Sequence, residues 1–133
     1  MTVRSYDFAT GALLWEAGGL GENTIPQPVQ HETRLYVLSD SGQLSAFDAS
    51  TGKPLYQQAR LPRPYNFKAS PVGAAGRLYL ATEDEDVVVV RMGDAFEVLA
   101  TNTLTEQSFI ASPIALGNNL YLRSRTHLFA IGK

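Results

Sequence analysis

The sequence of 133 residues contains no cysteine. Disulfide bonds, thiolate catalysis and cysteine-based zinc, haem or iron–sulfur sites are therefore excluded. Long apolar runs are missing as well: the longest, residues 87–90, is far below the roughly 20 residues of a membrane-spanning helix. No charge of one sign dominates, since 11 Lys and Arg stand against 13 Asp and Glu. The net charge of −2 gives no electrostatic reason to expect binding to nucleic acid or to an anionic membrane.

Local signatures of catalysis are also lacking. There is no phosphate-binding loop, dinucleotide fingerprint or zinc-protease motif, and no serine stands in a G-x-S-x-G elbow. Residues 1–7 hold no apolar stretch of the signal-peptide type, which indicates either a cytoplasmic protein or a chain without its upstream part.

What the sequence does contain is an internal repeat. A proline with an aliphatic residue, followed by Leu-Tyr-Val or Leu-Tyr-Leu, occurs three times, with its tyrosine at Tyr36, Tyr79 and Tyr121. These tyrosines lie 43 and 42 residues apart, and Ser70 and Ser112 precede the proline in the last two copies. A period of this length, built from short apolar runs and turns, is typical of β-propeller blades of four antiparallel strands.

The strands of one unit are predicted at residues 28–30, 34–38, 43–47 and 54–58. Continuous apolar runs at residues 35–38 and 87–90 indicate strands that are buried on both faces, as in stacked sheets. With 11 Gly and 7 Pro, no long helical period survives. A β-sandwich fits the length but does not require the regular recurrence, so the repeat favours the propeller.

Divided by this period, the chain gives about three blades. We expect residues 1–21 to supply the third and fourth strands of one blade, residues 28–59 and 71–100 to form complete blades, and residues 112–133 to form an incomplete last blade. Because closed propellers have about four to eight blades, the fold class expected is an all-β partial propeller. The remaining blades of a longer protein, or a second copy, would close the ring. A ring of two copies leaves the strand at residues 2–7 surplus, which favours the longer protein.

A second repeat surrounds the turn between the third and fourth strands of a unit. Its first copy consists of Asp7, Thr10, Gly11 and Trp15, and its second of Ala46, Asp48, Thr51, Gly52, Lys53 and Tyr56. The second copy resembles the docking motif A-x-D-x-x-T-G-K-x-x-W of pyrroloquinoline-quinone (PQQ)-like propeller repeats, with Tyr56 in place of Trp. The third unit departs from the motif, since Arg91 stands where Asp48 stood. Residues 120–133 are similar to the closing end of such proteins, including the BamB-like assembly lipoproteins.

This resemblance implies a C-terminal propeller fragment, a periplasmic or extracellular location and protein partners. An aromatic residue buries a large area, so Trp15 and Tyr56 are interpreted as contacts to the neighbouring blade. The leading hypothesis is a non-enzymatic scaffold for protein interaction or assembly, with no cofactor. The alternative is a fragment of a PQQ-dependent oxidoreductase whose active site lies in missing blades; only then are PQQ and calcium expected.

An acidic run is the first candidate site. Its carboxylates are oxygen ligands of the kind that calcium takes, but in a hairpin turn such groups are ordinarily solvated, and calcium is the minor interpretation. The run consists of Glu83, Asp84, Glu85 and Asp86. The two histidines, His31 and His127, lie in separate turns without an evident carboxylate partner and are interpreted as surface or packing residues.

A basic and aromatic loop is the second candidate. It contains Arg60, Arg63, Tyr65, Phe67 and Lys68. Three cations in an acidic chain do not support stacking on nucleic acid, so we interpret the segment as a loop between blades that contacts a protein partner. A third function, binding of a glycan or polymer, is suggested by Tyr65 and Phe67.

Overall fold

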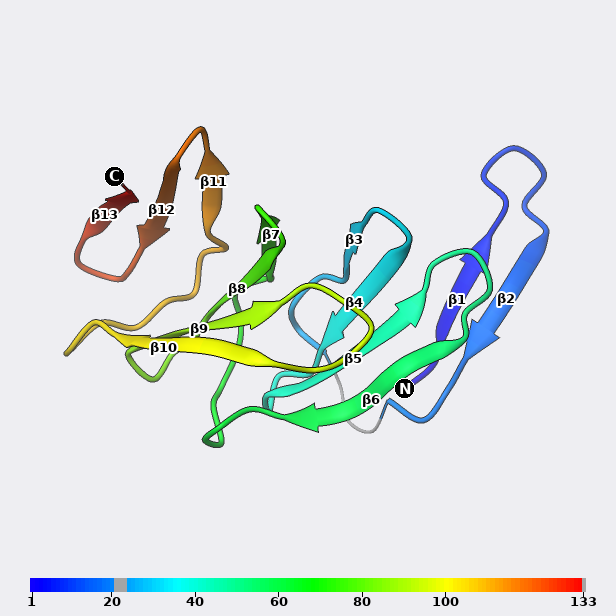
Figure 1. Cartoon of the computed structure of the whole chain (residues 1–133), viewed down its shortest axis with the longest axis horizontal. Helices are drawn as coiled ribbons and strands as arrows, with labels where there is room; N and C mark the ends of the chain where they lie inside the picture. Colours follow the sequence, from blue (N-terminus) through cyan, green and yellow to red (C-terminus); the bar gives the residue numbers. More distant parts are fainter. Residues whose placement is uncertain (21–23, 133) are drawn as a thin grey trace.

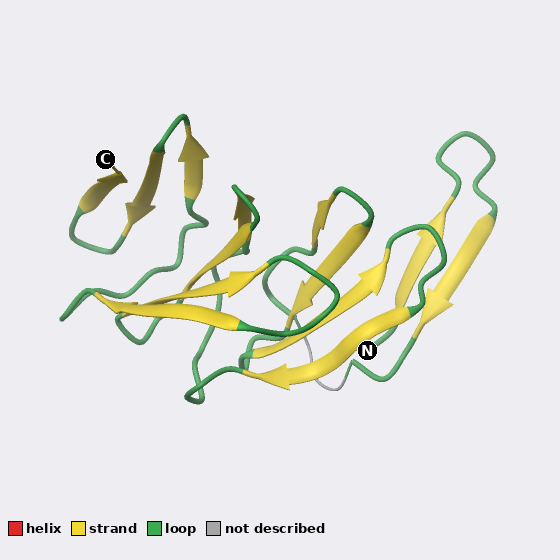
Figure 2. Ribbon diagram, in the orientation of Figure 1, coloured by secondary structure: helices red, strands yellow, loops and turns green. Residues whose placement is uncertain are grey.

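The computed structural model describes residues 1–20 and 24–132, and these form thirteen β-strands and no helix (Figures 1 and 2). The strands are β1 (Val3–Tyr6), β2 (Leu13–Ala17), β3 (Val29–His31), β4 (Arg34–Leu38), β5 (Gln43–Asp48), β6 (Pro54–Arg60), β7 (Val72–Ala74), β8 (Arg77–Ala81), β9 (Asp86–Arg91), β10 (Val98–Thr103), β11 (Ile114–Leu116), β12 (Asn119–Arg123) and β13 (Leu128–Gly132). Within the described residues there is accordingly no helix that could cross a membrane.

The strands pair antiparallel into four sheets that follow chain order. The first sheet is β1–β2, the second β3–β6, the third β7–β10 and the fourth β11–β13. They succeed one another across Figure 1, and the inner strands β3, β7 and β11 of neighbouring sheets are in contact. The all-β partial propeller is confirmed, and the four sheets hold two, four, four and three strands. The predicted strand ends differ by one or two residues from those observed.

The core lies between the sheets rather than in one centre. One cluster joins the first and second sheets, a larger one joins the second and third, and a smaller one joins the third and fourth. Strand β9 shows the principle: Val88 and Val90 belong to the cluster facing the second sheet, while Val87 belongs to the one facing the fourth. All four valines of β9 are at most 6% exposed, as the continuous apolar run predicts.

The turn from β5 to β6 is organised by Asp48. Its Oδ1 accepts the N–H groups of Ser50 and Thr51 at 2.9 and 3.0 Å, and Gly52 follows in the left-handed region with φ 74°. The Ser50 hydroxyl, which donates at 2.6 Å, and these N–H groups lower the pKa of the Asp48 carboxyl. The β1–β2 turn has the same construction around Asp7, whose Oδ1 accepts N–H groups two and three residues on at 2.9 and 2.8 Å.

Trp15 of β2 fastens the first sheet to the second. Its Nε1 donates to the carbonyl of Ala49 at 2.9 Å, and its ring covers Gly52 so closely that a Cβ there would lie 2.5 Å from a ring carbon. Tyr56 of β6 makes the corresponding contact to the third sheet, where it meets Phe96 edge-on with centroids 5.7 Å apart. The aromatic ends of both docking motifs therefore pack on the turn of the next sheet.

The Ser-Pro repeat acquires a physical role in the structure. Ser70 Oγ accepts the N–H of Gln27, and Ser112 Oγ accepts the N–H of Ser70, each at 2.9 Å. Each serine thus ties the start of an inner strand to the equivalent residue of the preceding sheet. This hydrogen-bond ladder explains why a serine hydroxyl recurs at the period of the repeat.

Candidate interaction site

The loop between β6 and β7 carries the predicted basic and aromatic cluster. Tyr65 and Phe67 are 2% and 1% exposed, form an edge-on pair with centroids 6.1 Å apart, and belong to the core between the second and third sheets. Because the loop crosses the open end of that core, its two rings cap it. The prediction that Tyr65 and Phe67 contact a partner or a glycan is therefore wrong.

The three cations of this loop remain at the surface. Arg60 is exposed at the end of β6, and the side chains of Arg63 and Lys68 are 61% and 46% exposed. The Arg63 guanidinium lies over the Tyr65 ring at 5.3 Å, and Lys68 Nζ lies 2.9 Å from a carboxylate oxygen of Glu83. The buried rings thus hold the backbone while the cations face outward.

Asp86 is the buried anchor of the loop. Its Oδ2 accepts the hydroxyl of Tyr65 at 2.7 Å and an N–H of Arg63 at 3.3 Å, and its Oδ1 accepts the hydroxyl of Thr103 at 2.6 Å. Burial alone would raise the pKa of Asp86, but the hydrogen bonds from Thr103 and Tyr65 and the charge of Arg63 outweigh it and lower that pKa. Burial, followed by the bond to the carboxylate, raises the pKa of Tyr65 to about 12. One carboxylate thereby joins the loop, β9 and β10.

The other three carboxylates of the acidic run each bind a different partner. Glu83 pairs with Lys68, Asp84 accepts the N–H of Asn66 at 2.7 Å, and Glu85 accepts that of Glu106 at 2.6 Å. No group of three metal-ligating side chains converges among the residues that the structure describes. The interpretation of the run as a solvated turn is wrong for Asp86, which is 1% exposed because it opens a buried strand. Calcium binding by this run is without geometric support.

The structure brings the two candidate sites together at one end of the sheets. Besides the ion pairs, the N–H of Glu83 donates to the carbonyl of Asn66 at 3.0 Å, and that of Phe67 to the carbonyl of Asp40 at 2.9 Å. A hollow of about 320 Å³ lies between the loop and the turns, lined among others by Asp40, Asn66, Lys68 and Glu83. The result is a surface of mixed charge, which we call the loop surface. It carries the cations Arg60, Arg63 and Lys68 and the acidic residues Asp40 and Glu83. Sequence reasoning missed the pairing of loop and turn because it depends on neighbouring sheets.

The histidines take no part in this surface. His127 Nδ1 lies 2.7 Å from the Thr126 hydroxyl, and its ring lies 5.7 Å from that of Phe129. His31 ends β3 and is half-buried near Gly73. His31 thus belongs to the second sheet, whereas His127 lies in the turn before β13 of the fourth sheet.

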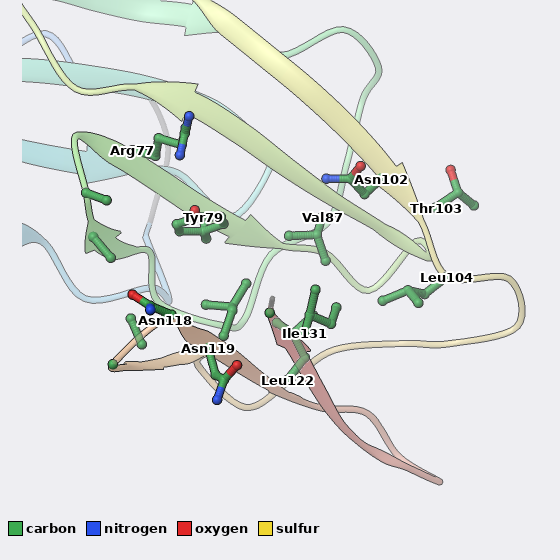
Figure 3. Close-up of a pocket in the computed structure, with 16 residues that line it drawn as sticks. Arg77, Tyr79, Val87, Asn102, Thr103, Leu104, Asn118, Asn119, Leu122 and Ile131 are labelled. Atoms are coloured by element: carbon green, nitrogen blue, oxygen red, sulfur yellow. The ribbon is translucent and has the colours of Figure 1, made fainter.

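A second hollow, of about 650 Å³, lies between the third and fourth sheets (Figure 3). Tyr79 and Val87 of the third sheet form one wall, and Leu122 and Ile131 of the fourth sheet form the other. Sequence reasoning did not predict it, because its two walls come from different sheets.

The family model described as "Outer membrane protein assembly factor BamB" matches residues 1–131. The chain belongs to this BamB family. The resemblance of the docking motifs to PQQ-like, BamB-like repeats is thereby confirmed. No curated protein matches the chain by sequence search.

Solved structures agree with the BamB fold. BamB from Moraxella catarrhalis superposes with a TM-score of 0.79 at 17% identity, over 98% of this chain and 40% of that one. The computationally designed Ika4 protein gives 0.77 at 13% identity, over 98% of this chain and 80% of that one. A europium-containing methanol dehydrogenase gives 0.58 at 14% identity, over 77% and 21%. This BamB-family chain thus spans less than half the length of the Moraxella protein.

Proposed function

We propose that this propeller segment is a non-enzymatic scaffold that binds protein partners through its loop surface, as part of an assembly factor in the periplasm. The observation that carries the proposal is the use of the repeated residues. Trp15, Tyr56 and Ser70 all serve contacts between sheets, and the match to the BamB family model covers residues 1–131. Function in such repeat architectures resides in loops at the ends of the sheets, since packing occupies the strands.

The loop surface suits a protein partner for two reasons. Its backbone is fixed by buried rings and by Asp86, so little conformational entropy is lost when it binds. Its exposed cations, Arg60 and Arg63, are of the kind that contributes strongly to protein interfaces when desolvated. A partner with an acidic patch fits this surface, with Glu83 and its neighbours at the rim.

The test is affinity chromatography on an extract of periplasm and outer membrane from the source cells, with the chain and two variants as baits. Arg60→Glu reverses a loop charge that no core contact uses, and we expect it to reduce capture of the partner at least tenfold. Arg77→Glu is the matched control, because Arg77 is exposed and begins β8 at the opposite end of the third sheet. Equal capture by both variants would refute the loop surface as the binding site.

The oxidoreductase alternative is tested separately. The chain is incubated with PQQ and calcium, desalted, and assayed for retained cofactor absorbance and for dye-linked alcohol oxidation. We expect neither. Stoichiometric retention with turnover would contradict the scaffold function.

A further inference from the structure

The turns that join the second and third strands of the second, third and fourth sheets share one construction. Each begins with a hydroxyl-bearing residue that directly follows the last paired position of the second strand, at Leu38, Ala81 and Arg123. These hydroxyl-bearing residues are Ser39, Thr82 and Ser124. Each hydroxyl oxygen accepts one or two backbone N–H groups that lie two to four residues further on, at 2.9–3.2 Å. The three turns are therefore structurally equivalent.

The chain segments between the sheets join these turns into one row. The segment at residues 66–67 binds the first two turns through one backbone N–H and one carbonyl. Phe109 makes the next connection: its N–H donates to the carbonyl of Thr82 at 2.9 Å, and its backbone pairs with that of Ser124. The turns follow one another along one side of the molecule (Figure 1). We call this surface, residues 39–42, 82–85 and 124–127 with their connecting segments, the turn row.

The residue after each hydroxyl differs in charge, although the hydroxyl itself recurs. The equivalent positions hold Asp40, Glu83 and Arg125. The acidic side chains of the third sheet's turn already bind Lys68 or backbone N–H groups. Among the described residues, none pairs with the carboxylate of Asp40 or with the exposed guanidinium groups of Arg123 and Arg125. The turn row therefore offers a free carboxylate at one end and free guanidinium groups at the other.

The hollow of about 320 Å³ lies beside the free carboxylate of Asp40. Its lining includes the side chain of Ile25, which is 57% exposed; Lys68 also lines it, but Glu83 neutralises that ammonium group. A volume of about 300 Å³ is at the lower limit of small-molecule sites and accommodates a single side chain. The aliphatic stem of a lysine or arginine would pack on Ile25 while its charged head reaches Asp40.

A second exposed isoleucine lies before the basic end of the row. Ile25, Lys68 and Ile110 occupy equivalent positions, each two residues before a member of the serine hydrogen-bond ladder. Ile110 is 43% exposed. Because neighbouring sheets pack about 10 Å apart, the ends of the turn row are separated by about 20 Å. An extended chain covers that distance in about six residues, with alternate side chains on one face.

We propose that the turn row binds an extended segment of a protein partner in which a basic residue and an acidic residue stand about six positions apart. The basic side chain enters the hollow at Asp40, the acidic side chain meets Arg123 and Arg125, and an apolar side chain between them covers Ile110. This inference rests on the proposed binding of protein partners at this end of the sheets. It adds the chemistry of the partner and the turn of the fourth sheet.

The test uses a blocked synthetic peptide of seven residues, with arginine first, isoleucine fifth, glutamate seventh and serine elsewhere. In an extended chain the three distinctive side chains share one face. A second peptide has citrulline in place of arginine, and a third has glutamine in place of glutamate. Titration of the ¹⁵N-labelled chain, followed by amide chemical shifts, locates each peptide and gives its Kd.

We expect shifts in the turn row and a specific coupling at each end. Asp40→Asn should weaken binding of the first peptide about three- to fivefold, the effect of one surface ion pair, and leave binding of the citrulline peptide unchanged. Arg125→Gln should do the same for the first peptide and leave the glutamine peptide unchanged. Asp94→Asn and Arg77→Gln are the matched controls at the opposite end of the sheets, and neither should change any Kd.

Three outcomes overturn the proposal: no binding of the first peptide, shifts confined to other surfaces, or a variant that weakens the charged peptide and its neutral counterpart equally. The capture experiment with Arg60→Glu fails independently of this one, because Arg60 lies outside the turn row. Normal capture by Arg60→Glu with intact coupling would overturn the loop surface alone. Reduced capture by Arg60→Glu without coupling would overturn the partner chemistry proposed for the turn row alone.

Discussion

Two glycines in equivalent turns offer a controlled measurement of how strongly neighbouring sheets are fastened. Gly52 and Gly11 occupy the same motif position with φ 74° and 72°. A Cβ at Gly52 would lie 2.5 and 2.7 Å from two ring carbons of Trp15, whereas a Cβ at Gly11 would have no neighbour within 4 Å. Replacement by alanine therefore imposes the same backbone strain at both sites, but displaces an aromatic ring only at Gly52.

The expected costs follow from these contacts. Gly11→Ala should lower the free energy of unfolding by about 1–2 kcal/mol, the cost of a left-handed residue with a Cβ. Gly52→Ala carries that cost and also separates Trp15 from Ala49, which removes a hydrogen bond worth about 1 kcal/mol and part of a buried aromatic surface worth about 1–2 kcal/mol. The difference between the two variants should thus be about 2–3 kcal/mol.

Urea unfolding followed by circular dichroism measures both costs. Because Trp15 is the single tryptophan, its fluorescence should also shift to the red in Gly52→Ala and stay unchanged in Gly11→Ala. In a Trp15→Ala background the extra cost at Gly52 should vanish. Equal costs at the two glycines in the parent chain, or an extra cost that persists without the indole, would refute the docking argument.

Three further predictions concern buried polar groups. Tyr56 Oη is buried and has no hydrogen-bond partner among the described residues, so Tyr56→Phe should leave stability unchanged or raise it by about 1 kcal/mol. Tyr36→Phe should lower stability by about 1 kcal/mol, because Tyr36 Oη accepts the N–H of Gly93 at 3.0 Å. Thermal unfolding distinguishes the two variants, and a loss of stability in Tyr56→Phe would contradict the assignment. Asp86→Asn should lower the free energy of unfolding by about 2–3 kcal/mol, since it replaces a buried carboxylate that accepts hydrogen bonds with an amide whose NH₂ group would face those donors. Asp94→Asn is the control, because the Asp94 carboxylate is exposed, and it should lower the free energy of unfolding by less than about 1 kcal/mol. Because the folded-state pKa of Asp86 is lowered, its contribution is present above the unfolded pKa of about 3.9 and is lost as the pH falls through the folded value; the Asp86→Asn variant should therefore lose less stability than the parent between pH 5 and pH 2.

The parts of the fold that could be predicted from sequence are those set by local chemistry. Turns around Asp7 and Asp48 follow from a carboxylate that accepts neighbouring N–H groups and a glycine that takes positive φ. Strand β9 follows from an apolar run too continuous for a strand with one wet face. In the two turns, the groups that form the hydrogen bonds lie within a few residues of one another. In β9, the apolar run itself indicates that both faces of the strand are buried.

The candidate site was less predictable because its contacts join distant segments. Tyr65 and Phe67 stand among arginines and prolines, a composition typical of an exposed loop. Their rings are nevertheless buried, because they pack into the open end of the core between the second and third sheets. Asp86 belongs to a run of four carboxylates, and only its position as the first residue of β9 separates it from Asp84. A hydroxyl 21 residues away, on Tyr65, decides its role.

The interfaces between sheets also differ in a way that bears on where the molecule can act. In a stacked repeat, stability is approximately a sum of terms for neighbouring units. The first interface has Trp15 with a hydrogen bond, the second has Tyr56 packed edge-on against Phe96, and the third has a hollow between Val87 and Ile131. The contacts between neighbouring sheets thus differ from one interface to the next, and the largest core cluster lies between the second and third sheets. The loop surface lies beside that cluster, where the ion pair with the buried Asp86 holds the Arg63 side chain.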